Sequence, residues 1–198
     1  MESQEKKEIL HLIDNLKKIN YVKPKDIPNI ELYMDQVTTF MDRHLESSKR
    51  YTEDKLLTKT MINNYTKNNL LPSPNKKKYS KNHMYLLIFI YYMKNLLSIS
   101  DIQSILGPLT EKFFDDSDEI KLEDIYQEVF RSGEKHATTL SKDVIKMYEN
   151  SKTTFSYEEG KENKDFLELF SFISMLCFDV YMKKQLIEKL IDENFTKK

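Results

Sequence analysis

The stretch LTKTMINNYTKNNLLPSPNKKKYS, residues 57–80, decides the fold that the sequence predicts. Thr58 is a good N-cap, because its hydroxyl can accept a hydrogen bond from a free amide in the first turn of a helix. We expect this helix to continue to about Asn68, because Asn69 tolerates the left-handed conformation that ends helices and two prolines follow. The basic segment 75–80 then suits the tip and return of a small β-hairpin.

Charge sets this region apart from the rest of the chain. Between Lys55 and Ser100 there are eight lysines and no acidic residue, although Asp and Glu make up 32 of the 198 residues and the formal net charge is −1. Lys59, Asn63 and Lys67 recur every four residues, so a helix would carry them on one face. A positive segment between acidic ones predicts a surface that binds a polyanion. The alternative is a solvated basic face in a lysine-rich protein.

Helical patterns surround this stretch on both sides. Apolar residues at helical spacing predict one helix that ends near Asn20 and a second from about Ile30 to Ser47. After the hairpin, an apolar helix is expected over about Lys81 to Leu97. A short helix should follow it and end at Gly107 and Pro108.

The order of a capped helix, a short basic hairpin and a long apolar helix is that of a winged helix-turn-helix. More specifically, residues 57–106 resemble the DNA-binding part of the MerR family of transcriptional regulators. The corresponding positions are the helix end at Asn69, Leu70 and Leu71, the wing at Lys77, Tyr79 and Ser80, and a later motif at Ser98, Ile99 and Ile102. The recognition helix departs from that family, since Asn63, Asn64 and Tyr65 stand where an arginine and paired tyrosines are usual.

The combination of ELYMDQV, LTKTMINNYTKNNLL and KKKYSKNHM looks closer still to a YkrK-like family of uncharacterised bacterial proteins. This resemblance covers most of residues 25–110 and implies the same winged-helix fold without adding an activity. Gly107 and Pro108 interrupt the position at which MerR proteins begin their dimerising helix.

The predicted fold class is therefore mainly α, a winged helix-turn-helix with a small β-hairpin wing plus a C-terminal helical module. We divide the chain into an N-terminal helix over 1–24, a MerR-like DNA-binding domain over 25–110 and an acidic helical module over 111–198. Two helices and a loop are expected in the last module before a long helix over about 165–192. That helix is apolar from Phe166 onward, so it either forms a homodimer or lies in the core of one chain.

Charge and resemblance together predict a sequence-specific protein that binds double-stranded DNA as a transcriptional regulator. Lysines neutralise phosphates, whereas Asn63 and Asn64 can read bases, because a carboxamide pairs with the N6 and N7 edge of adenine. The three arginines lie outside the cationic segment, so sites containing A·T pairs are expected to be preferred. The candidate DNA-binding residues are Thr58, Lys59, Thr60, Asn63, Asn64, Tyr65, Lys67, Lys76, Lys77, Lys78 and Tyr79.

Two of these residues, and the fold itself, are open to other interpretations. Packing in the core is as good an interpretation of Tyr65 and Tyr79 as a contact with phosphate. A degenerate winged helix could instead be a protein–protein interaction module whose basic face docks an acidic partner. RNA binding is less favoured, because it more often uses aromatic side chains on an open sheet. Further expected partners are a second copy of the chain and an unknown small-molecule or protein effector.

Enzyme chemistry has little support in the sequence. The four histidines have no companion His or Cys at ligand spacing, so we expect no metal and no cofactor. The acids over 115–119 fit a helix N-terminus better than a calcium loop, because Lys121 stands where that loop requires Gly. Cys177 is expected to be a buried, inert thiol. The longest apolar run, residues 84–93, is too short to cross a bilayer, and together with the single cysteine it predicts a cytoplasmic protein.

Overall fold

The computed structural model describes residues 4–16, 21–115, 117–157 and 160–195. Helices dominate these residues, with one small antiparallel sheet of two strands, so the mainly helical prediction is confirmed. The chain divides into two compact units. One combines the N-terminal helix with residues 132–187, and the other combines the chain after that helix, as far as Arg131, with the C-terminal end from Glu188.

The second unit contains the cationic stretch. Its elements in chain order are η1 Pro24–Asp26, β1 Leu32–Tyr33, α2 Met34–His44, η2 Glu46–Ser48, α3 Lys59–Lys67, β2 Lys78–Tyr79, α4 Lys81–Met93, α5 Ile99–Phe113 and the first part of α6 Leu122–Ser151. Strands β1 and β2 are antiparallel, with Leu32 opposite Tyr79 and Tyr33 opposite Lys78. The second strand thus pairs with a segment that precedes α2 in the chain.

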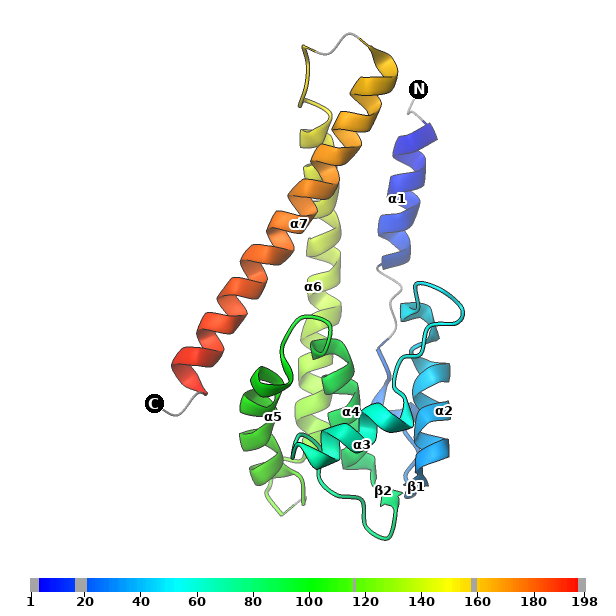
Figure 1. Cartoon of the computed structure of the whole chain (residues 1–198), viewed down its shortest axis with the longest axis vertical. Coiled ribbons are helices and arrows are strands. Elements are labelled where there is room, and N and C mark those ends of the chain that lie inside the picture. Colours follow the sequence, from blue (N-terminus) through cyan, green and yellow to red (C-terminus); the bar gives the residue numbers. More distant parts are fainter. Residues whose placement is uncertain (1–3, 17–20, 116, 158–159, 196–198) are drawn as a thin grey trace. The chain divides into compact units, whose positions relative to one another are not determined.

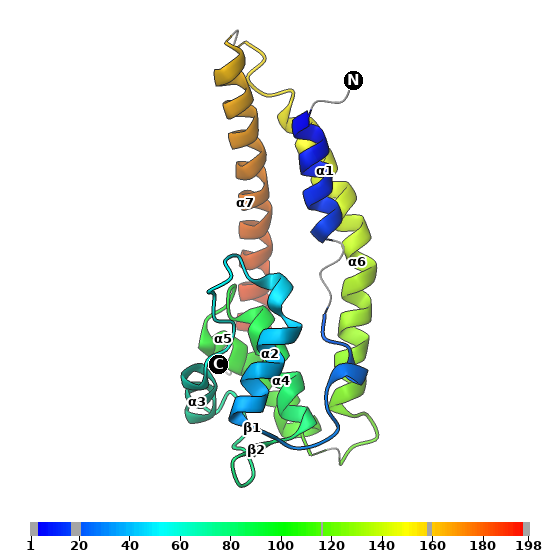
Figure 2. The same ribbon diagram turned by 90° about the vertical axis from the view of Figure 1, so that its right-hand side faces the viewer.

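Helix α4 is the centre of this unit. It is apolar on nearly its whole circumference, and every side chain from Asn82 to Tyr91 is buried. Figures 1 and 2 show it among α2, α3 and α5. The Tyr126 hydroxyl of α6 donates a 2.6 Å hydrogen bond to the Val22 carbonyl oxygen, which fixes the entry of the chain into this core.

A connector over 49–58 joins α2 and α3. At its start, the Asp54 carboxylate accepts hydrogen bonds from the backbone amides of Arg50 (3.1 Å) and Tyr51 (3.0 Å). At its end, Leu56 and Leu57 are buried in the core of the unit. The connector is therefore anchored at both ends although it contains no long helix or strand.

Several predicted boundaries were wrong. Residues 32–33 form β1 rather than the start of a helix, because pairing with β2 satisfies their backbone, and α2 begins only at Met34. Helix α5 continues through Gly107 and Pro108 to Phe113. The proline lacks an amide to donate, but Leu106 on one side and Leu109 on the other pack against the core and hold the helix together.

Further corrections concern the acidic half. The acids Asp115, Asp118 and Glu119 lie in the segment before α6, not within a helix. Helix α6 is one continuous helix where two were predicted, and α7 begins at Lys161. The predicted end of the first helix near Asn20 lies outside the described residues.

The first unit consists of α1 Gln4–Leu16, the part of α6 from Ser132 and the part of α7 Lys161–Asn194 up to Ile187. Lys152 Nζ lies 3.0 Å from Glu168 Oε2, and Glu168 is buried although it is an acid. The rings of Tyr148 and Phe172 meet edge to face with centroids 5.4 Å apart. These contacts pair α6 with the early part of α7.

In the part of the chain that the structure describes, no helix has the length and hydropathy needed to cross a bilayer.

The Tyr126 hydrogen bond gives a first prediction. Replacing Tyr126 by Phe should lower the free energy of unfolding by about 1–2 kcal/mol, because the Val22 carbonyl is left buried without its donor. The Tyr92 hydroxyl is also buried but makes no hydrogen bond among the described residues. Tyr92→Phe is thus a matched control that should leave stability unchanged or raise it, and urea unfolding measures both. An equal loss in the two variants would contradict this account.

Candidate nucleic-acid interface

Helix α3 forms because its sequence supplies both ends. The Thr58 hydroxyl oxygen accepts from the Met61 amide at 3.1 Å, which confirms the predicted N-cap. At the other end Asn69 has a φ of 54°, and the Leu70 amide donates to the Tyr65 carbonyl at 2.9 Å. This is the left-handed termination that the sequence predicted. The helix is thus fixed at a length of nine residues.

The two faces of α3 have opposite character. Ile62 and Tyr65 are buried against the core. Lys59, Asn63 and Lys67 are exposed, as are the predicted contacts Thr60 and Asn64 beside them. Figure 2 shows α3 at the edge of this unit. The structure therefore places the polar residues of the predicted recognition helix on one accessible face.

The basic turn after α3 has an unusual backbone. The Lys78 amide donates to the Asn75 carbonyl at 2.8 Å and closes a four-residue turn. The two central residues, Lys76 and Lys77, have φ angles of 48° and 66°. Positive φ at both centres is the pattern of a type I′ turn, for which Asn-Gly is the preferred pair. Both lysine side chains are exposed.

Acidic side chains from outside the stretch reach some of its lysines. Lys59 pairs with Asp35 of α2, and Lys78 Nζ lies 3.8 Å from Glu31 Oε2. The first pair is largely exposed and the second about half exposed, so solvent screens both. Lys67, Lys76 and Lys77 have no ion-pair partner in the described ranges of the chain. Among the lysines predicted to contact DNA, these three have ammonium groups that no carboxylate of the described residues pairs with.

Two predicted contacts lie in the core. Tyr65 and Tyr79 are only 6% and 3% exposed. Burial raises the pKa of both phenols. The Tyr79 ring meets the His83 ring edge to face, with centroids 5.4 Å apart. Both tyrosines therefore pack in the core, as the alternative interpretation predicted.

His83 joins the turn to α4, a role that the sequence analysis missed. Its Nδ1 atom accepts from the Ser80 amide at 3.0 Å and lies 2.8 Å from the Ser80 hydroxyl. Nδ1 is therefore unprotonated, and His83 takes the place of the usual Glu or Gln in a capping box. The Ser-x-x-His spacing over 80–83 was the available signal.

Burial lowers the pKa of His83 below its ordinary value of 6.5. The carbonyls of Pro72 and Ser73 and the Glu31 carboxylate oppose this effect only in part. The Nε2 atom is buried without a well-aligned hydrogen bond among the described residues. Protonation would place a hydrogen on Nδ1, which would then face the Ser80 amide that now donates to it.

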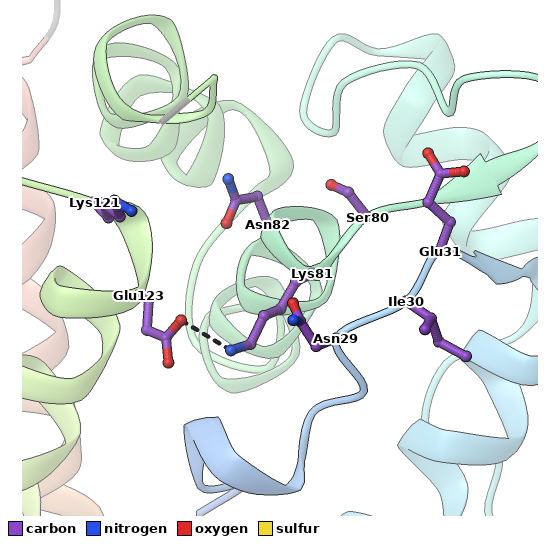
Figure 3. A pocket seen from close by; sticks show the side chains of 8 residues that line it. All are labelled: Asn29, Ile30, Glu31, Ser80, Lys81, Asn82, Lys121 and Glu123. Carbon is purple, nitrogen blue, oxygen red and sulfur yellow. Dashed lines mark hydrogen bonds and ion pairs between the residues drawn. The ribbon is translucent and has the colours of Figure 1, made fainter. Parts of the chain in front are cut away.

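A polar pocket of about 360 Å³ lies in the same unit, where α4 and α6 begin. Figure 3 shows Lys81 and Glu123 at this pocket, with Lys81 Nζ 2.8 Å from Glu123 Oε2. Asn82 donates through Nδ2 to the Phe114 carbonyl at 2.7 Å. Lys81 thus belongs to the cationic stretch in sequence, but its ammonium is held by α6. The pocket residues fasten elements together rather than extend the interface.

No group of three or more His, Cys, Asp or Glu residues that could hold a metal ion occurs among the described residues. Cys177, predicted to be buried, is exposed on α7. The prediction was wrong because the apolar neighbours of Cys177 are themselves exposed in this part of the helix.

Comparison with known proteins places the chain in a family. The model of a domain of unknown function, DUF1836, matches residues 22–129. Because this match covers more than half of the chain, the protein belongs to the DUF1836 family. The matched region includes β1, α2, α3, β2 and the basic turn between α3 and β2. Neither the curated proteins nor the solved structures include a significant match.

The capping histidine gives a pH prediction. Because the folded-state pKa of His83 is lowered, stability should be constant above about pH 6.5, fall as the pH drops from 6.5 to the folded-state pKa, and level off below it. His83→Gln should remove this component, because a Gln side chain can accept from the Ser80 amide without titrating. Unfolding by urea at several pH values measures both proteins. If the stability of the natural protein and of His83→Gln changed with pH in the same way, His83 would not be the titrating group.

Proposed function

We propose that residues 31–113 form a winged helix-turn-helix that binds double-stranded DNA and regulates transcription. In this proposal α3 is the recognition helix and the turn over 75–78 is the wing. The order β1, α2, α3, turn, β2, α4 and α5 supports it, as does the earlier resemblance to MerR regulators and a YkrK-like family. The expected target is a site containing A·T pairs.

The backbone of the wing turn is the observation that carries the proposal. A residue with a side chain costs roughly 1–3 kcal/mol when it is held in a sparsely populated backbone region. Lys76 and Lys77 both have positive φ, where Asn and Gly would be less strained. Two exposed ammonium groups are thus kept at the tip of a turn against its conformational preference. Phosphate binding explains why lysine is useful there.

The face of α3 supplies what the wing lacks. Asn63 and Asn64 project from the helix with both carboxamides exposed, and neither side chain makes a hydrogen bond within the described residues. The side-chain NH2 of an asparagine can donate to N7 of adenine while its side-chain oxygen accepts from N6, so one asparagine can bind the major-groove edge of one adenine through two hydrogen bonds. Lys67 at the end of the same face is free to contact the backbone. In this proposal the asparagine side chains recognise the base sequence, and the lysine side chains position the protein on the DNA backbone.

The wing turn gives a test with two readouts of opposite sign. The double variant Lys76→Asn, Lys77→Gly should be more stable than the natural protein by on the order of 1 kcal/mol, because it relieves positive φ at lysine. The same variant should bind DNA more weakly and lower the slope of log K against log salt by nearly 2, because two phosphate contacts are lost. Urea unfolding and fluorescence anisotropy at several salt concentrations measure the two effects.

The control for the turn is Lys142→Ala. It removes an exposed lysine from α6 and should leave DNA affinity unchanged. A turn variant with unchanged DNA affinity would rule out the wing as a contact, whatever its stability.

The helix face gives the second test. Asn63→Ala should lower affinity for a selected A·T-containing site by roughly 5- to 150-fold with an unchanged salt slope, because it removes a base contact worth about 1–3 kcal/mol. Lys67→Ala should weaken binding to all sequences and lower the salt slope by about 1. Asn95→Ala, on an exposed turn after α4, is the matched control for the carboxamide. If selection from a random DNA pool enriched no sequence, the proposal that α3 recognises bases would be wrong.

The alternative function is an interaction module whose basic face docks an acidic protein. The ion pairs Lys59–Asp35 and Lys78–Glu31 favour this function, because they show that lysines of this face bind carboxylates. Binding to DNA with little salt dependence, combined with capture of an acidic peptide, would support this function over DNA reading.

A further inference from the structure

Helix α7 carries an apolar stripe on its exposed side. The stripe follows helical spacing and consists of Phe166, Leu169, Phe170, Ile173, Cys177, Val180 and Tyr181. Except for Cys177, which is also exposed, these side chains are between 41% and 66% exposed. All seven lie within about 60° of one line along the helix, and no charged residue interrupts them.

The acids of the same segment point the other way. Glu168 is buried and pairs with Lys152 Nζ at 3.0 Å, and Asp179 Oδ2 lies 2.6 Å from Lys183 Nζ. A helix that faced only water would be expected to show the opposite arrangement, with carboxylates outward and phenyl rings inward. The stripe is therefore built as a contact surface.

The area of the stripe fits a helix-pair interface. The three aromatic side chains, each offering roughly 150–250 Å² in total, contribute about 350 Å² at their exposed fractions. Leu169, Ile173 and Val180 add on the order of 150 Å². Two such surfaces together bury about 1,000 Å², which reaches the lower bound for a specific interface.

The stripe is also complementary to itself. Its midpoint lies between residues 173 and 174. A two-fold axis there sets Phe166 opposite Tyr181 of a second copy and Phe170 opposite Cys177, so that a large ring meets a small side chain. Ile173 comes to lie beside Ser174 near the axis. Isologous contacts of this kind are typical of dimers with two-fold symmetry.

We propose that the protein forms a homodimer through this stripe, with the two α7 helices antiparallel and Ile173 near the two-fold axis. The inference does not rest on DNA binding. If the proposed DNA function also holds, the dimer presents two readers to a two-fold symmetric site. The two ideas fail separately, because one is measured by mass and the other by DNA affinity.

The test begins with the natural protein at micromolar concentration in analytical ultracentrifugation. A dimer of twice 23.7 kDa is expected. Ile173→Asp should raise the dimer dissociation constant by about 100-fold or more, because it buries two like charges at the axis. Met182→Asp places the same charge on the opposite side of α7, at a residue that is 70% exposed, and should stay dimeric. A monomeric natural protein, or equal loss in both variants, overturns the proposal.

Thiol chemistry checks the pairing without relying on the folding of Ile173→Asp. Phe170→Cys should form an intermolecular disulfide with Cys177 of the other copy under mild oxidation. The natural protein should not cross-link, because its two Cys177 residues would lie about 10 Å apart along the antiparallel helices, beyond disulfide reach. Efficient Cys177–Cys177 cross-linking of the natural dimer would overturn the antiparallel arrangement.

Discussion

Burial of α4 on nearly every side is the constraint on which the DUF1836 part of this protein depends. A helix that is apolar around its circumference must be covered by other elements, since each exposed Leu, Ile or Phe forfeits roughly 1.5–3 kcal/mol. The cover is supplied by α2, α3, α5 and the start of α6, all represented in one continuous core. Ile62 and Tyr65 give α3 its inner face, and this fixes which residues of α3 remain outside. The orientation of the candidate interface is thus a consequence of core packing.

The beginning of α4 adds a second constraint, because the turn, β2 and the helix are consecutive. The Ser80 cap and the His83 ring meet Tyr79 at the end of β2, and β2 in turn pairs with β1. The basic turn therefore projects from a fixed base although its own tip is exposed. A rigid base under a charged tip suits a contact with a regular polyanion better than a long, loosely held basic loop, since less ordering is needed on binding.

Local signals in the sequence were enough for much of this description. The Thr58 cap, the left-handed Asn69 and the exposed face of α3 follow from residue chemistry within one or two helical turns, and the structure confirms them. Long-range pairing was not available in the same way. Strand β1 exists because β2 lies beside it, and the extension of α5 past Pro108 depends on packing of Leu106 and Leu109. No local sequence pattern predicts the strand or the extension of the helix.

The candidate site shows the same division. Exposure of Lys67, Lys76 and Lys77 could be predicted from their spacing and their absence of acidic neighbours. The partners of Lys59, Lys78 and Lys81 could not, because Asp35, Glu31 and Glu123 are brought to them by the fold. Charge counted along a sequence therefore overstates the charge that a folded surface presents.

The connector between α2 and α3 has a consequence for how this fold can change. The start of α3 is held separately by the buried Leu56 and Leu57, so the small turn over 50–54 that Asp54 closes could open and lengthen without moving α3. Doubling such a loop costs only about 0.6 kcal/mol in closure entropy. This position is a natural place for insertions during evolution. It is equally a site where a fluorescent tag or an added peptide could be introduced while the exposed face of α3 keeps its geometry.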